Sequence, residues 1–135
     1  MDARAYLENY ETINYKIRNK ENEIERWKGI AEGSTGNSDG ERVQSSGNKQ
    51  KMASAVVEYA DLEREIESLK AEKKAIMDNI DKLKGKHYDF IYKHYVLGMM
   101  IKTISSQYGM SESWGTTTHS RALQSMQKIL DAEAI

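Results

Sequence analysis

Apolar residues recur near the start of the chain at alternating steps of four and three residues. They are Tyr6, Tyr10, Ile13, Ile17, Ile24, Trp27 and Ala31, with Lys20 as the one polar member of the series. This spacing places the side chains along one face of a helix, and it is typical of a heptad seam that packs against a second helix. Asp2 precedes the run, and its carboxylate can cap the first turn. The pattern predicts a long helix from Asp2 to about Ala31.

A second run begins near residue 50 and has mostly the same spacing. Its members are Met52, Val56, Tyr59, Leu62, Ile66, Leu69, Lys73, Ile76, Ile80 and Leu83. We expect this helix to close at Gly85, because glycine is the usual residue just past a helix end. The intervening stretch, "GSTGNSDGERVQSSGNK" at residues 33–49, is rich in Gly, Ser and Asn and is predicted to be a flexible linker.

Neither long helix can bury its apolar seam alone, so we expect residues 1–85 to fold back as an antiparallel coiled-coil hairpin. A hairpin this thin leaves apolar flanks exposed, and we therefore predict a homodimer in which two hairpins form a four-helix arrangement. The residues assigned to the hairpin and dimer seam are Tyr10, Ile13, Ile17, Ile24, Trp27, Val56, Tyr59, Leu62, Ile66, Leu69, Ile76 and Ile80.

Residues 86–135 show three shorter amphipathic segments. Tyr88, Ile91, Tyr92, Tyr95 and Val96 mark the first, which ends at Gly98; Ile101, Ile104 and Tyr108 mark the second, which ends at Gly109. Ser111 is a good N-cap for a third helix with Ala122, Leu123, Met126, Ile129 and Leu130 on its apolar side. A short helix, a glycine turn and a longer capped helix predict a helix-turn-helix domain. The chain is therefore expected to be all-α.

Composition narrows the classes of function. The 135 residues include no Cys and no Pro. They carry 20 Lys and Arg against 21 Asp and Glu, so the net charge of the whole chain does not indicate nucleic-acid binding. No apolar run reaches the roughly 20 residues of a membrane span, and no secretory signal begins the chain, so we expect a cytoplasmic protein. The three histidines are not spaced as metal ligands usually are, and the sequence has no recognisable motif for a nucleophile, an acid–base pair or a phosphate-binding loop. We expect no enzyme activity, no metal and no cofactor.

Three motifs carry a resemblance to a known family. "YKHYVLG", "IKTISSQYGMS" and "HSRAL" resemble sigma factor region 4, and more closely the sigma-like phage transcription activators of the RinA and ArpU type. Upstream, "ERVQSSGNKQKMASAVVEYADLEREI" is similar to a serine-containing stretch followed by a long helix in those proteins. The resemblance covers about residues 14–130. It implies a phage-encoded regulator that binds double-stranded promoter DNA and acts with host RNA polymerase in the bacterial cytoplasm.

The resemblance also implies which residues contact DNA, with the third helix in the major groove. Hydroxyl groups can donate to phosphates or base edges, and an arginine can clamp a phosphate or a guanine. The expected contact residues are Lys102, Ser111, Ser113, Trp114, Thr116, Thr117, Ser120 and Arg121.

The family pattern lapses at Gly115 and Thr118, where relatives carry aliphatic residues that pack the recognition helix. Residues 86–135 are also close to neutral, with five Lys and Arg against four Asp and Glu, a net of +1. These two observations keep an alternative open: a protein-binding module, such as a host-takeover inhibitor or a packaging adaptor, that reuses the helix-turn-helix frame without tight DNA binding.

Overall fold

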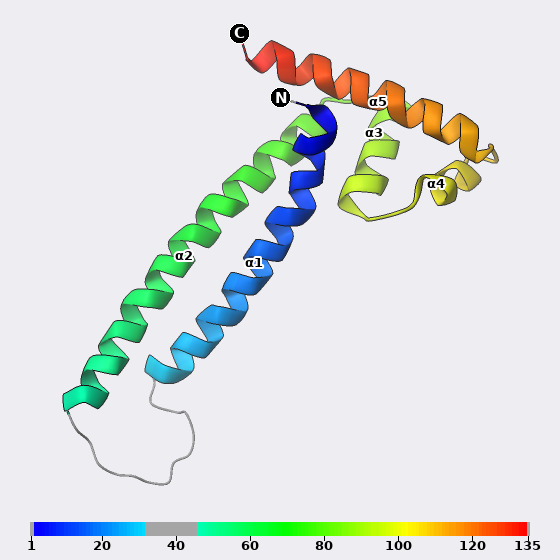
Figure 1. The fold of residues 1–135 in the computed structure, drawn as a ribbon. Coiled ribbons are helices and arrows are strands. Elements are labelled where there is room, and N and C mark those ends of the chain that lie inside the picture. Colours follow the sequence, from blue (N-terminus) through cyan, green and yellow to red (C-terminus); the bar gives the residue numbers. More distant parts are fainter. Residues whose placement is uncertain (1, 32–45, 135) are drawn as a thin grey trace. The chain divides into compact units, whose positions relative to one another are not determined.

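The computed structural model describes residues 2–31 and 46–134 of the chain. In order, its elements are α1 (Ala3–Ala31), α2 (Ser46–Ile80), α3 (Gly85–Ile91), a π-helix η1 (Tyr92–Val96), α4 (Ile101–Gln107) and α5 (Glu112–Glu133), shown in Figure 1. These described ranges contain no strand, so the prediction of an all-α chain is confirmed. Residues 33–45 of the predicted linker lie outside the described residues. Residues 46–49 already belong to α2, because extending an existing helix adds one hydrogen bond for each residue fixed.

The chain divides into two compact units, Tyr15–Ala71 and the combination of Met1–Asn14 with Glu72–Ile135. We call the first the hairpin unit and the second the end unit. Within the hairpin unit α1 and α2 run antiparallel and side by side (Figure 1). Lys20 forms an ion pair with Glu65 at 2.6 Å, and the Lys28 ammonium lies 5.6 Å from the centre of the Tyr59 ring. The predicted helical hairpin is therefore present.

The predicted seam agrees with the observed burial at all but one position. The buried members are Tyr10, Ile13, Ile17, Ile24, Leu62, Ile66, Ile76 and Ile80, and the half-buried ones are Trp27, Tyr59 and Leu69. Val56 is 45% exposed, whereas its neighbour Ala55 is fully buried. The heptad explains the difference: a strict alternation of three and four residues runs from Met52 through Ala55 to Tyr59, and Val56 lies off that series. Val56 is therefore not part of the seam buried within the hairpin of one chain, and its place in a dimer seam stays a prediction.

The end unit contains the thickest core. Its fully buried side chains come from the five α-helices and include Leu7, Ile13, Ile80, Phe90, Ile91, Ile104 and Met126. The helices α3 and α4 both pack against α5 (Figure 1). The start of α1 also contacts α5, because the Ala3 amide donates to Gln127 Oε1 at 2.8 Å. Asp2 caps α1 as predicted, its carboxylate accepting from the Ala5 amide at 3.0 Å.

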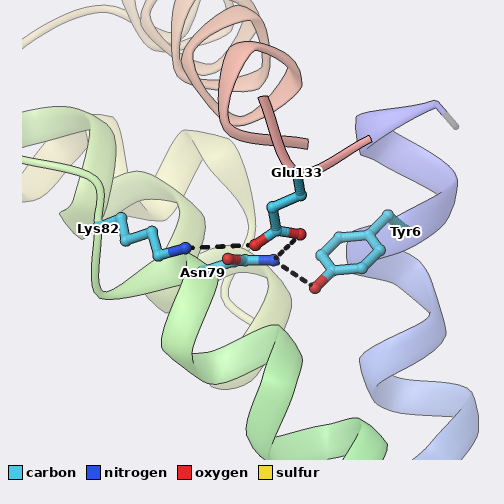
Figure 2. Close-up of polar contacts among 4 residues, drawn as sticks. All are labelled: Tyr6, Asn79, Lys82 and Glu133. Atoms are coloured by element: carbon cyan, nitrogen blue, oxygen red, sulfur yellow. Dashed lines mark hydrogen bonds and ion pairs between the residues drawn. The ribbon is translucent and has the colours of Figure 1, made fainter. Parts of the chain in front are cut away.

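A polar cluster joins three segments of the end unit, as Figure 2 shows. The Asn79 side-chain amide is almost fully buried and donates to the Tyr6 hydroxyl at 2.8 Å and to Glu133 Oε1 at 3.2 Å. Lys82 binds the other oxygen of Glu133 at 3.2 Å. We call these four residues the Asn79 cluster. It ties the beginning of α1 and the end of α2 to the last turn of α5.

Gly85 does not close the long helix, contrary to the sequence prediction. α2 ends at Ile80, and its last turn tightens as the Lys82 and Leu83 amides bond back to Asn79 and Ile80. Gly85 is instead the first residue of α3 and has a φ of 57°, which a residue with a side chain rarely adopts. The end of α2 is set by the change of direction into α3, and Leu83 remains buried in the turn.

Candidate functional site

The N-terminus of α5 forms as the sequence predicts. Ser111 is the N-cap, and its hydroxyl accepts from the Trp114 amide at 3.1 Å. Glu112 supplies a negative charge in the first turn, where it complements the helix dipole. Gly109 precedes the cap with a φ of 70°, and the amides of Gly109 and Met110 bond back to Ser106 and Ser105 at the end of α4. A sharp turn therefore joins α4 to α5.

The helix α5 is continuous through the positions where the family pattern lapses. Gly115 is buried against Ser105 of α4: a Cβ on Gly115 would overlap the Ser105 hydroxyl and lie 3.1 Å from a methyl group of Ile101. Thr118 is also buried, and its hydroxyl donates to the Trp114 carbonyl at 2.9 Å. The two positions thus still face the packed side of α5. Small residues there allow the α4 and α5 backbones to approach closely.

Trp114 is a packing residue in this unit. Its ring meets Phe90 edge-on at 5.7 Å between centroids and lies 5.5 Å from the ring of Tyr108. The Lys86 ammonium sits 5.6 Å from the Trp114 ring centre, a cation–π distance. Burial raises the pKa of Tyr108 to about 12, with a further contribution from its hydrogen bond to Asp89. This aromatic cluster holds the start of α5 against α3 and the end of α4.

His119 is an interhelix hydrogen-bonding residue. Its Nε2 lies 2.9 Å from the Tyr95 hydroxyl of η1, and its ring packs edge-on against His94 at 5.2 Å. Burial lowers the pKa of His119 to about 4, and the nearby His94 and Arg4 push it in the same direction. Burial also raises the pKa of Tyr95 to about 12. Both groups are therefore neutral near pH 7 and hold η1 against α5.

The opposite side of α5 is an exposed polar surface. At 100° per residue, Ser113, Thr116, Thr117, Ser120 and Arg121 lie on the side away from the buried Gly115, Ala122 and Met126. We call these five the outer face. The Thr116 hydroxyl donates to the Glu112 carbonyl of its own helix, whereas Arg121 has no ion-pair partner among the described residues.

The predicted contact residues therefore separate into two groups. The outer face is exposed and continuous. The Ser111 hydroxyl instead caps α5, and the Trp114 ring packs against Phe90. Lys102 is exposed in the first turn of α4, and its ammonium is in no ion pair of the described part of the chain.

Sequence reasoning missed cations that flank the outer face. Lys128 follows Arg121 by seven residues, and Arg121 follows Trp114 by the same interval, so the three share one stripe of α5. Lys86 of α3 reaches that stripe at Trp114. The interval of seven in the sequence could have revealed Lys128. Nothing in the sequence could have placed Lys86, because its position depends on how α3 crosses α5.

In the described residues no three His, Cys, Asp or Glu side chains gather as metal ligands would. None of the helices there is long and apolar enough to cross a membrane. Comparison with protein-family models, with curated proteins and with solved structures gives no match.

Proposed function

We propose that the protein is a DNA-binding transcription regulator in which α4, the Gly109 turn and α5 act as a helix-turn-helix. The observation that carries the proposal is the two-sided construction of α5. One side is packed against α3 and α4, and the other presents four threonine or serine side chains and an arginine without a carboxylate partner in the described residues. The resemblance to phage activators of the RinA and ArpU type supports the same assignment.

The dimensions and chemistry of α5 suit a major groove. A groove about 12 Å wide admits one α-helix, and the N-terminal residues of a recognition helix usually meet the base edges. Ser113, Thr117 and Ser120 offer hydroxyls that can donate to or accept from bases, and Arg121 can bind guanine or phosphate. Lys102, exposed at the start of α4, is the proposed contact to a phosphate beside the groove.

A direct test is a mobility shift and footprint on DNA selected from a genomic pool. Arg121→Ala is expected to weaken specific binding by about 1–3 kcal/mol and to relax the preference at one base position. Arg64→Ala is the matched control, because Arg64 is an exposed arginine paired with Asp61 in the hairpin unit. Absence of any retarded complex at low salt would rule out the proposal.

The partner proposed with DNA is host RNA polymerase, in the cytoplasm of a bacterium that carries the phage. This part rests on the resemblance alone. Recovery of polymerase with the protein on promoter DNA, and increased transcription from that promoter, would support it. Retention of polymerase without DNA or promoter dependence would contradict an activator role.

A homodimer is part of the proposal, because two helix-turn-helix units on paired half-sites bind more tightly than one. The supporting observation is that Val56 and Val57 of α2 are 45% and 60% exposed. Sedimentation of the 15.5 kDa chain should show a species of twice that mass, and Val57→Lys should shift it toward monomer. A clean monomer at tens of micromolar would contradict the dimer and leave the hairpin intact.

The alternative is a protein-binding module, and one observation favours it. Leu97, Met100 and Met110, in the turns on either side of α4, are 56%, 63% and 46% exposed. Exposed methionine and leucine side chains are frequent at protein-docking surfaces. Crosslinking from position 100 into a host or phage protein in nuclease-treated lysate, together with no DNA retardation, would favour this alternative over DNA binding.

A further inference from the structure

A positively charged hollow lies beside the outer face of α5. It has a volume of about 290 Å³ and is lined by residues of the turn after α2, of α3 and of α5: Lys82, Leu83, Lys84, His87, Ser125, Lys128 and Ile129. Three of these side chains are ammonium groups, and none is a carboxylate. Such a set of lining residues favours an anion, because several donors converge and no acid opposes them.

The three lysines differ in how their charges are used. Lys82 forms an ion pair with Glu133 at 3.2 Å as part of the Asn79 cluster (Figure 2). Lys84 and Lys128 are exposed and have no ion-pair partner in the described part of the chain. The hollow therefore offers two available cations and a third that Glu133 neutralises.

Two further polar groups line the hollow and are already positioned. The Ser125 hydroxyl and His87 Nδ1 lie 3.0 Å apart, which links α5 to α3 across the hollow. The contact fixes the ring and the hydroxyl next to the lysines. This contact uses one donor proton of the pair, so either the Ser125 hydroxyl or His87 Nε2–H remains to donate to an anion oxygen.

The hollow lies along the same helix as the outer face and next to it. Lys128 lies two helical turns beyond Arg121 on the same stripe, about 10.5 Å along the axis of α5. Lys84 precedes Lys86, whose ammonium lies over Trp114 on that stripe. Cations therefore follow one flank of α5 from its first turn to the hollow. A groove-bound recognition helix needs such a flank, since the phosphate strands border the groove.

We propose that the hollow between Lys84 and Lys128 binds a phosphate of the DNA backbone next to the site read by the outer face. The inference rests on the proposed function and adds a defined backbone contact to it. Lys84 and Lys128 neutralise the phosphate, and the Ser125–His87 pair donates one hydrogen bond to a phosphate oxygen. Glu133 holds Lys82 out of this contact. The contact carries no base information, so it strengthens binding to all sequences alike.

The test is the salt dependence of binding to labelled duplexes, measured by fluorescence anisotropy with a selected site and with mixed-sequence DNA. Each lost phosphate contact flattens the slope of log affinity against log salt by about 0.9. Lys84→Gln/Lys128→Gln removes the one phosphate contact of the hollow and should flatten the slope by about 0.9 on both duplexes. Arg121→Ala should instead reduce the ratio between the two affinities. Lys51→Gln/Lys70→Gln, two exposed lysines of α2, is the matched control and should leave the slope unchanged.

Glu133→Gln is the complementary variant. The amide keeps an acceptor for Asn79 but no longer neutralises Lys82, which is then free to contact a neighbouring phosphate, so the slope should steepen by up to about 0.9. An unchanged slope here overturns the role given to Lys82. Wild-type binding with an unchanged slope in Lys84→Gln/Lys128→Gln overturns the phosphate site and leaves the proposed function standing. Failure of the wild-type protein to bind either duplex overturns both.

Discussion

At the scale of single residues, the close contact between Gly115 and Ser105 decides how α5 packs. A helical glycine is about 1 kcal/mol less favourable than alanine when nothing contacts it. Here the missing Cβ leaves room for the Ser105 hydroxyl, which is buried and donates to the Ile101 carbonyl at 2.8 Å. Tertiary packing therefore outweighs helix propensity at this position.

Gly115→Ala is expected to destabilise the protein by about 1–3 kcal/mol, because the added methyl overpacks the α4–α5 contact. Adding Ser105→Ala removes the overlapping hydroxyl, so the double variant should recover most of the loss. Urea unfolding followed by circular dichroism measures the free energy of unfolding of each variant. Ser105→Ala alone completes the double-mutant cycle. A stabilised Gly115→Ala variant would show that α4 and α5 are not in close contact.

His119 makes stability depend on pH. Its pKa in the folded protein, about 4, lies below the ordinary value of 6.5, so the unfolded chain binds the proton more readily. The stabilisation is fully present above about pH 6.5 and is lost as pH falls toward 4, by a total of about 1–3 kcal/mol.

The measurement for His119 is the free energy of unfolding between pH 7 and 4 for the wild type and for His119→Gln. Subtracting the two curves removes the titration of the carboxylates, which both proteins share. The wild type should lose more stability over this range. Parallel curves would contradict a buried neutral His119.

At the scale of elements, the helices of the end unit are delimited by local signals that act in the expected places. Gly98 and Gly109 have φ values of 75° and 70° and follow the ends of η1 and α4. Ser111 then begins α5. These residues act through their own backbone preference, which explains why the sequence located them correctly.

Ser111→Ala should destabilise the protein by about 1 kcal/mol, because it removes the acceptor of the Trp114 amide. Hydrogen exchange should accelerate mainly in the first turn of α5. Ser111→Asp should restore stability, since aspartate is an equally good cap and its charge suits the dipole. Ser113→Ala, at an exposed neighbouring position, is the control. Equal effects of the alanine variants at 111 and 113 would contradict capping.

At the scale of the whole molecule, residues distant in sequence meet only in the fold. The Asn79 cluster joins residues 6, 79, 82 and 133. A buried amide costs stability unless it is hydrogen-bonded, and the cluster satisfies Asn79 with one partner from α1 and one from α5. Burial raises the pKa of Tyr6, so its hydroxyl remains neutral in this contact.

Tyr6→Phe should destabilise the protein by about 1–3 kcal/mol, because Asn79 loses a buried acceptor. Combining Tyr6→Phe with Asn79→Leu removes both polar partners, and the double variant should regain part of that stability. Thermal unfolding of the single and double variants measures the coupling. Strictly additive losses would indicate that the two side chains do not interact.

The sequence by itself determined the helical class, the hairpin, most of its buried seam and the cap of α5. These features depend on periodicity and on the backbone preferences of single residues, both of which are local. Tertiary structure decided that α2 ends at Ile80 rather than Gly85 and that Gly115 packs against Ser105. It also brought Lys84 and Lys128 to one hollow and Lys82 to Glu133. Such contacts depend on where helices cross, and a crossing is set by the joint packing of distant side chains.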